Sequence, residues 1–400
     1  MKKRTAPNLI FWVCYVAYTA IYLSRVNLTM AAPALKETAL LDAAQIGVLG
    51  GVFSVIYAFG RMFNGWLSDR LSPRRMIPVG LLLCGAANLL VGLLPPYPAF
   101  LLLWGINAYA QSMLWSSNLR LLAALHDEEE AQRRASWLIT SVSAGNLAGI
   151  LLSGHLVSDL GVRWAFLVPG GFTLLCFAAA LLTLPDVSPA RTAEKSSGPV
   201  QLLRDTAAVF IDRRIRRMVV PTLCLGIMKD NISLWMAVYV VDTFGIDLRT
   251  SSWYVLLIPA VGLVGRLLYP FCYRISGHRE QRVAAVSYAV CFLFSILLLL
   301  FVPSPLAAVV WLSVVYAANS LISTAVGGSF PLRFLDTGNV ATVSGLLDLL
   351  VYSGAALSSL IFGFAIRAFG YAVMFAVWVA VSALSALLLL RNATLHEKGA

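Results

Sequence analysis

Two cationic side chains, Arg25 and Lys229, lie within stretches of sequence that are otherwise largely apolar, Tyr22–Asn27 and Ile227–Asn231. A charge inside an apolar helix is costly unless it pairs or faces water, so such residues are candidates for a functional site. Arginine offers a planar two-pronged donor to a carboxylate or phosphate, and lysine offers a compact charge. The pair predicts an anion-binding site. The alternatives are an Arg25 side chain that extends to the membrane interface, and Lys229 and Asp230 as structural ions where helices pack.

The segments that position these cations are apolar enough to cross a membrane. The 400 residues are 59% hydrophobic and 12% charged, whereas soluble domains carry about a quarter charged residues. Several apolar runs reach the roughly 20 residues that a helix needs to span the hydrocarbon. We therefore expect an all-α integral membrane protein with 12 transmembrane helices in two six-helix bundles. The expected spans are 8–33, 43–68, 75–95, 98–125, 134–158, 162–184, 216–241, 250–274, 282–302, 305–330, 339–366 and 370–391.

The distribution of positive charge sets the orientation of these spans. Of the Lys and Arg residues, 21 lie at the termini and in the even-numbered gaps, and four lie in the odd-numbered gaps. Cytoplasmic loops are enriched in Lys and Arg, so both termini are predicted to be cytoplasmic. This distribution also explains the net charge of +11 without a nucleic-acid partner. Five further cations fall within spans: Arg25, Arg61, Arg120, Lys229 and Arg266.

One long polar stretch divides the chain near its middle. We expect an N-terminal bundle at 1–184, a cytoplasmic linker at 185–215 and a C-terminal bundle at 216–400. Arg25 and Lys229 stand 204 residues apart, in the first span of each half. Because each half has an even number of spans, the halves are predicted to be parallel repeats with a substrate site between them near the midplane.

The loop after the second span carries a motif. Gly65–Arg75 resembles the loop signature of the major facilitator superfamily: Gly, three residues, Asp, Arg, and then two further basic residues. Gly65 would allow close approach of a neighbouring helix, and Asp69 would meet the positive end of a helix. With Arg70 and Arg74, these residues are predicted to form a conformational latch. An ordinary basic loop is the alternative.

The first and seventh spans make the resemblance more specific. Together with the loop, they resemble the organophosphate:inorganic phosphate antiporter family, in which paired basic residues on these spans bind the substrate phosphate. Arg25 and Lys229 occupy the matching positions, although family members usually carry arginine at both. The first span is also similar to the anion:cation symporter family, whose members often have an acidic residue where this chain has Ser24. We expect Tyr22, Trp115 and Tyr239 to line the site.

The fourth span carries a polar face formed by Asn107, Gln111, Trp115 and Asn118, at spacings of three and four residues. Such a face is expected to meet a cavity or a packed neighbour. Asn118 is therefore a candidate substrate ligand. Both related families have an arginine near the position of Arg120, which makes it a third candidate cation, with a role as a gate or structural residue equally open.

Two carboxylates lie within spans, Asp230 and Asp348. Each is a candidate for an ion pair or for proton coupling, and Asp348 is a possible partner of Lys229 or of Arg266. The fifth span lacks the histidine of the antiporters, because Gly145 stands before Asn146 where they have it.

These observations predict a secondary active transporter of a small organic anion that works by rocker-switch alternating access. The resemblance to the organophosphate antiporters implies that the anion is a phosphorylated metabolite exchanged for phosphate. The alternatives are a proton- or sodium-coupled symporter of a carboxylate or sugar acid, and a non-transporting membrane sensor on the same fold. No catalytic cluster, cofactor motif or metal-ligand spacing is present, so we expect no enzyme activity, cofactor or metal. The resemblance implies a monomer in the bilayer of the bacterial inner membrane.

Overall fold

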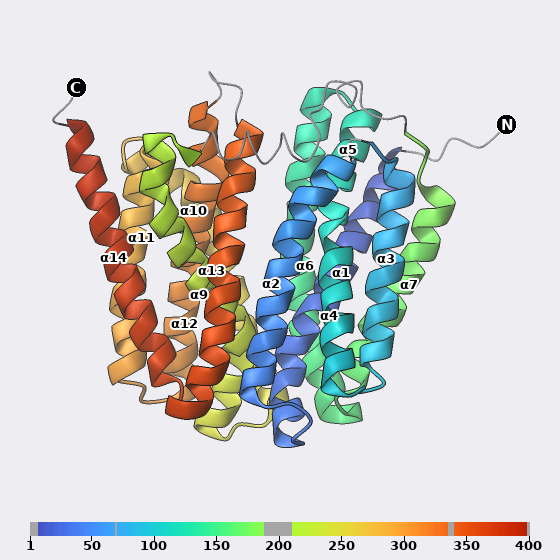
Figure 1. Ribbon diagram of the computed structural model, residues 1–400, viewed down its shortest axis with the longest axis horizontal. Helices are drawn as coiled ribbons and strands as arrows, with labels where there is room; N and C mark the ends of the chain where they lie inside the picture. The colour runs from blue at the N-terminus through green and yellow to red at the C-terminus, as the bar shows by residue number, and fades with distance from the viewer. Residues whose placement is uncertain (1–6, 69, 188–209, 335–339, 398–400) are drawn as a thin grey trace. The chain divides into compact units, whose positions relative to one another are not determined.

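The computed structural model describes residues 7–68, 70–187, 210–334 and 340–397, and these residues contain helices and no strand (Figure 1). The helices are α1 (Pro7–Glu37), α2 (Ala43–Ser68), α3 (Pro73–Val91), α4 (Tyr97–Ser112), α5 (Leu114–Leu125), α6 (Glu128–Leu160), α7 (Trp164–Thr183), α9 (Arg213–Phe244), α10 (Leu248–Ile275), α11 (Glu280–Leu300), α12 (Pro305–Thr324), η2 (Ala325–Ser329), η3 (Phe330–Phe334), α13 (Val340–Phe369) and α14 (Ala372–Glu397). In hydrocarbon every backbone polar group must be satisfied internally, which favours helices. The predicted all-α membrane fold is confirmed.

Eleven helices of the described residues are long and apolar enough to cross a membrane. The remaining predicted span, 98–125, is not one continuous helix, because it is broken at Met113 into α4 and α5. Two hydroxyl groups bond to the backbone beside the break: Ser112 Oγ donates to the Tyr109 carbonyl at 2.6 Å and Ser117 Oγ to the Met113 carbonyl at 2.7 Å. Such bonds compete with the helical pattern and bend helices. They give a physical reason for the break.

The described residues fall into two compact units. The first holds the described residues within Met1–Leu41 and Val52–Pro199, and the second holds those within Asp42–Gly51 and Val200–Ala400. In the first unit α1 packs against α6 and α7, and α3 packs against α7 and α4. In the second unit α9 packs against α13 and α14, and α11 packs against α14 and α12. The helices pair in the same order in both units, as an internal repeat predicts. The predicted linker boundaries stay a prediction, since 188–209 lie outside the described residues.

The short segment Asp42–Gly51 of the second unit is where α2 begins. Asp42 Oδ1 accepts the Gln45 backbone N–H at 2.8 Å, and Gln45 Oε1 accepts the Asp42 N–H at 2.9 Å. This reciprocal capping satisfies two backbone donors that a helix start leaves open. Arg367, in the last turn of α13, donates to Asp42 Oδ2 at 2.7 Å. The start of α2 is therefore fixed within that unit.

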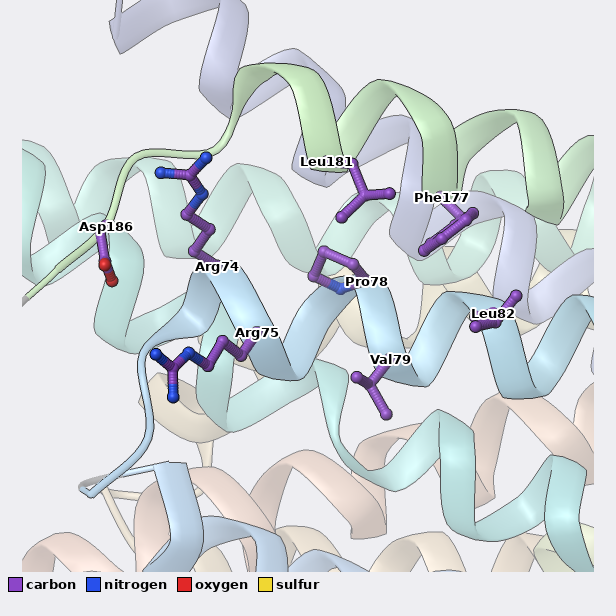
Figure 2. Close-up of a pocket in the computed structure, with 8 residues that line it drawn as sticks. All are labelled: Arg74, Arg75, Pro78, Val79, Leu82, Phe177, Leu181 and Asp186. Atoms are coloured by element: carbon purple, nitrogen blue, oxygen red, sulfur yellow. The ribbon is translucent and has the colours of Figure 1, made fainter.

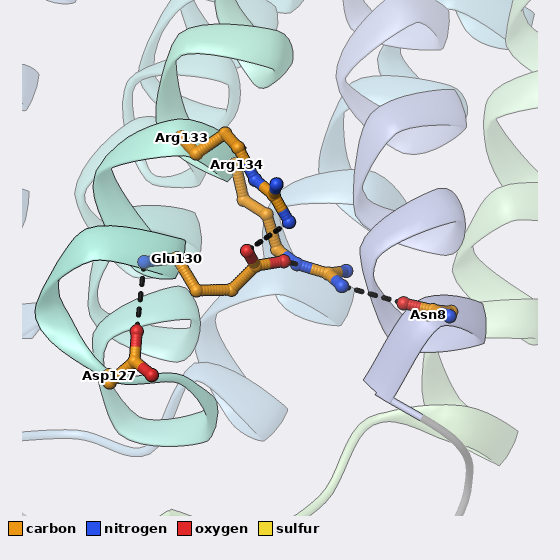
Figure 3. Close-up of polar contacts among 5 residues, drawn as sticks. All are labelled: Asn8, Asp127, Glu130, Arg133 and Arg134. Atoms are coloured by element: carbon orange, nitrogen blue, oxygen red, sulfur yellow. Dashed lines mark hydrogen bonds and ion pairs between the residues drawn. The ribbon is translucent and has the colours of Figure 1, made fainter.

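A polar cluster ties α6 to α1 in the first unit (Figure 3). Asp127 caps α6 by accepting the Glu130 N–H at 2.9 Å. Glu130 binds the guanidinium groups of Arg133 and Arg134, and Arg134 also donates to Asn8 at 2.6 Å. The hydrogen bond from Arg134 is the main reason that the pKa of the Glu130 carboxyl lies below its ordinary value. This cluster fixes the starts of both helices at one end of the unit.

The second unit has its own ionic contact at the start of α11. Arg333 Nη2 donates to Glu280 Oε2 at 2.8 Å, and Arg333 Nε lies 2.6 Å from Oε1. The Glu280 side chain is almost fully buried and begins α11, where the helix dipole favours a negative charge. Arg214 lies over the Phe334 ring at 4.0 Å and donates to the Arg333 carbonyl at 3.3 Å. These contacts join the starts of α9 and α11 to the segment that follows α12.

Glycines allow the helix pair α9 and α13 to pack backbone against backbone. A Cβ on Gly226 would collide with the Val351 carbonyl, and one on Gly354 would collide with the Leu223 carbonyl. Small residues at helix interfaces permit this approach in membranes. We infer that α9, which carries Lys229, is held in place by this close contact.

The substitution Gly226→Ala is expected to destabilise the protein by about 1–3 kcal/mol, because the new methyl group forces two backbones apart. The melting temperature in detergent should fall. Gly171→Ala is the matched control, since a Cβ on Gly171 in α7 would meet nothing within 4 Å. Equal melting temperatures for the two variants would contradict the close packing of α9 on α13.

Candidate functional site

Arg25 lies within an aromatic cage formed by α1 and α2 of the first unit. Its guanidinium carbon is 4.7 Å from the ring centroid of Phe53, 5.0 Å from that of Tyr57 and 5.8 Å from that of Tyr22. The rings of Phe53 and Tyr57 are stacked at 5.9 Å and both are buried. Attraction between a cation and ring faces is strengthened where water is excluded. These contacts favour a side chain held inside the unit over one that extends to the interface.

A second cation, Arg61, belongs to the same cluster. Its guanidinium carbon lies 6.0 Å from the Tyr57 ring centroid. Phe53, Tyr57 and Arg61 recur at four-residue intervals, which places them on one face of α2. From the sequence, Arg61 is one of the five cations within the expected spans and has no predicted role. The four-residue spacing of Phe53, Tyr57 and Arg61 is the sequence feature from which this face could have been predicted.

Two predicted site residues, Tyr22 and Trp115, meet through a third ring. Tyr18 lies 5.5 Å from Tyr22, edge to face, and 5.6 Å from Trp115. Tyr22 contacts Arg25 directly, while Trp115 of α5 is connected to Arg25 only through the rings of Tyr18 and Tyr22. The structure brings both into one aromatic cluster of the first unit.

A buried hydrogen-bond network fixes α1 on both sides of Arg25. Asn107 Nδ2 donates to the Ser24 carbonyl at 3.0 Å, and Gln111 Nε2 donates to Asn107 Oδ1 at 3.1 Å. Asn27 Nδ2 donates to Asn88 Oδ1 at 2.8 Å, and Asn88 Nδ2 donates to Asn107 Oδ1 at 3.2 Å. All five residues are buried. From the sequence, Asn107 and Gln111 could either line a cavity or pack against a neighbouring helix. Their hydrogen bonds make them packing residues that hold α1.

Asn118 and Arg120 of α5 lie in different surroundings. Asn118 is fully buried, and its two amide atoms have no hydrogen-bond partner among the described protein atoms. Arg120 Nη1 donates to the Leu71 carbonyl at 2.6 Å. This bond connects α5 to the loop between α2 and α3, so it supports a structural role for Arg120.

Three of the four predicted latch residues lie within the described part of the chain, and the latch itself stays a prediction. Asp69 lies outside the described residues. A Cβ on Gly65 would meet no described atom within 4 Å. Arg70 follows α2 with its backbone N–H bonded to the Leu67 carbonyl at 3.0 Å. Arg74 lies in the first turn of α3 and lines a groove that faces α7.

Lys229 of the second unit lies in α9 beside residues that anchor the helix. Asn231 Nδ2 donates to Ser358 Oγ of α13 at 2.6 Å, and Ser359 Oγ donates to Asn231 Oδ1 at 3.4 Å. The cation is followed two residues later by an anchoring asparagine, as Arg25 is followed by Asn27. The common offset of 204 residues therefore extends to the asparagines.

The two carboxylates predicted within spans, Asp230 and Asp348, are both half-buried. Asp230 lies on α9, and its Oδ2 atom is buried without a hydrogen-bond partner among the described atoms. Asp348 lies on α13. Its pairing with Lys229 or Arg266 stays a prediction.

Tyr239, predicted to line the site, packs in an aromatic cluster near the end of α9. It is 4% exposed, and its ring centroid lies 5.1 Å from that of Tyr371, 5.2 Å from Phe375 and 6.1 Å from Phe244. Ten residues separate it from Lys229, about 15 Å along the helix axis. The structure therefore gives Tyr239 a packing role at a distance from Lys229.

If the aromatic cage stabilises Arg25, Tyr57→Leu should lower the free energy of unfolding by about 0.5–2 kcal/mol through the lost cation–ring attraction. A double-mutant cycle with Arg25→Gln isolates that term. Tyr57→Phe is the matched control, because it keeps the ring and should show little coupling. An equal cost of Tyr57→Leu with and without Arg25 would contradict the cage.

Comparisons with known proteins agree with this arrangement. The sequence model of the Major Facilitator Superfamily matches residues 14–359. A probable hexose phosphate transport protein of Chlamydia trachomatis is 26% identical, over 65% of this chain and 62% of its own length. The membrane sensor protein UhpC of Salmonella typhimurium is 25% identical, over 64% of this chain and 61% of its own length. The chain thus spans somewhat less than two thirds of the length of these relatives.

The fold is similar to solved structures over almost its whole length. The crystal structure of the nucleoside transporter NupG superposes with a TM-score of 0.76, covering 96% of this chain and 98% of that one at 15% identity. At this identity the likeness concerns the fold alone.

Proposed function

Because the chain belongs to the Major Facilitator Superfamily, we propose that it is a secondary active transporter that exchanges a phosphorylated organic anion for inorganic phosphate. The observation that carries this proposal is the Arg25 guanidinium, held among the rings of Phe53, Tyr57 and Tyr22 inside an apolar helix. The resemblance to the organophosphate antiporters is supported by a relative named as a probable hexose phosphate transport protein.

The chemistry of the cage suits a phosphate group. A guanidinium can give two parallel hydrogen bonds to two phosphate oxygens, which adds geometry to charge. The ring faces of Phe53 and Tyr57 restrict the directions in which Arg25 can turn, and Arg61 brings a second positive charge to the Tyr57 ring. A dianionic phosphate is better matched to two cations than a single carboxylate is.

Lys229 is the proposed cation of the second unit. It occupies the position equivalent to Arg25, and the asparagine two residues later anchors its helix in the same way. In this proposal both cations bind the anion during a rocker-switch cycle of alternating access. Since cations in a membrane are costly without an anion, a return step without bound anion is disfavoured, which gives exchange a physical reason.

The proposed orientation, location and non-enzymatic role are supported by the charge distribution and by the relatives. The distribution of Lys and Arg supports cytoplasmic termini, and the bacterial relatives support an inner-membrane location. The relatives are named as a transport protein and a sensor, in keeping with a protein that is not an enzyme. We further propose that the transporter works as a monomer.

A sensor is the second candidate function, because one relative is named as the membrane sensor protein UhpC. A sensor would bind the same class of anion and would not carry it across the membrane. The third candidate function is symport of a carboxylate with protons. It is favoured by Asp230, because one of its carboxylate oxygens is buried and has no hydrogen-bond partner among the described atoms.

Counterflow separates these functions. Proteoliposomes loaded with phosphate should take up labelled hexose phosphate or glycerol phosphate without a pH gradient, because exchange needs only the internal anion. Uptake that requires a gradient and ignores internal phosphate would establish the symporter instead. Binding of the labelled compound with no flux under any gradient would establish the sensor.

Charge variants test the two cations. Arg25→Gln should reduce the affinity for phosphate about 10- to 100-fold, the effect of losing a charge-assisted pair of hydrogen bonds. Lys229→Gln should abolish exchange, whereas Lys229→Arg should retain it, because the related antiporters usually carry arginine there. Arg133→Gln is the control, since that side chain is 70% exposed at the start of α6. Phosphate exchange by Arg25→Gln at the wild-type affinity would exclude Arg25 from the site.

A further inference from the structure

A groove runs between α3 and α7 of the first unit and is unconnected with Arg25 (Figure 2). It has a volume of about 530 Å³. Its walls are formed by apolar side chains of both helices, and one end carries three charged side chains. The residues that line it are Arg74, Arg75, Pro78, Val79, Leu82, Phe177, Leu181 and Asp186.

The apolar walls are open to the surroundings of the protein. Val79 is 44% exposed, Leu82 41% and Leu181 46%. All three belong to helices that are apolar enough to cross a membrane, so these exposed side chains face hydrocarbon in a bilayer. From Arg75 to Leu82 the groove follows α3 for about 10 Å. A hydrocarbon chain fits such a surface.

The other end of the groove is polar. Arg74 and Arg75 lie in the first turn of α3, and Figure 2 shows their guanidinium groups at the same end as Asp186, which follows α7. The hydrogen bond from the Ser72 hydroxyl is the main cause that lowers the pKa of the Asp186 carboxyl, and the charges of Arg74 and Arg75 lower it further. Asp186 is therefore ionised, and the three groups carry one net positive charge.

Ser72 fixes this end of the groove. Its Oγ atom accepts the Arg74 N–H at 3.4 Å as the cap of α3, and it accepts the Val187 N–H at 3.3 Å. The chain that leaves α7 is thus tied to the start of α3. The Asp186 carboxylate already accepts a hydrogen bond from Ser72 and lies in the field of two arginines, so it is poorly placed to bind an added cation.

We propose that this groove is a binding site for an anionic phospholipid such as phosphatidylglycerol, with its phosphate at Arg74 and Arg75 and an acyl chain along Val79, Leu82 and Leu181. The net positive charge matches a single phosphodiester, and arginine is suited to phosphate oxygens. The apolar walls select a lipid over free phosphate. Under the charge-derived orientation this end lies in the cytoplasmic leaflet, where juxtamembrane basic residues attract anionic lipids.

Native mass spectrometry of the full chain tests the site. The protein is released from nanodiscs that contain equal amounts of phosphatidylglycerol, phosphatidylethanolamine and phosphatidylcholine with identical acyl chains. The wild type should retain phosphatidylglycerol preferentially. Arg74→Gln and Arg75→Gln should each lower the ratio of bound phosphatidylglycerol to phosphatidylcholine about fivefold, the effect expected for one basic residue. Arg133→Gln, outside the groove, should leave the ratio unchanged.

Two further variants keep the arginines and change the groove. Asp186→Asn should raise the retention of phosphatidylglycerol, because it removes the competing negative charge. Leu181→Trp should lower it, because the indole fills the space for the acyl chain. Equal retention of the three lipids overturns the proposal, as does retention that survives Leu181→Trp. Preferential binding of phosphatidylethanolamine that is lost in Asp186→Asn overturns it in favour of a zwitterionic lipid.

Discussion

The charge of Arg25 inside an apolar helix is the constraint on which the first unit depends. A guanidinium in hydrocarbon is costly unless surrounding groups compensate for lost water. Here compensation comes from three ring faces, two of them stacked on α2. Those rings keep the guanidinium within the unit, and a phosphate brought to it would complete the compensation. The same feature therefore explains both the packing of α2 and the proposed selectivity for anions.

The buried amide network extends this constraint to the backbone. Cation–ring attraction is weakly directional, so the rings alone would not fix where Arg25 lies along α1. Asn107 and Asn27 hold the backbone on either side of it, through the Ser24 carbonyl and through Asn88. In the second unit Asn231 serves the helix that carries Lys229. These buried amides position the charged residues, and each of their donors finds an acceptor inside its own unit.

The fold could largely be predicted from the sequence. Exposing an apolar residue to water or a charge to hydrocarbon has a cost that depends on the residue type, so the sequence alone indicates which segments lie in the membrane. Arg25 was identified for that reason. Its neighbours Phe53 and Tyr57 were not, because an aromatic residue in a membrane helix is ordinary by composition and only its spacing from Arg61 distinguishes it. The break at Met113 depends on local hydroxyl bonds that hydropathy does not contain. Tyr239 illustrates the same limit: a ring near a helix end serves packing or binding equally well until its neighbours are known.

Ligand-dependent thermal stability of the purified protein shows whether Arg25 forms the phosphate site. A ligand that binds the folded state raises the melting temperature with its concentration. Phosphate and a hexose phosphate should stabilise the wild type at concentrations where chloride salts of equal ionic strength do not. This stabilisation should be absent in Arg25→Gln and retained in Arg133→Gln. Equal stabilisation of the wild type and Arg25→Gln by phosphate would mean that Arg25 does not bind it.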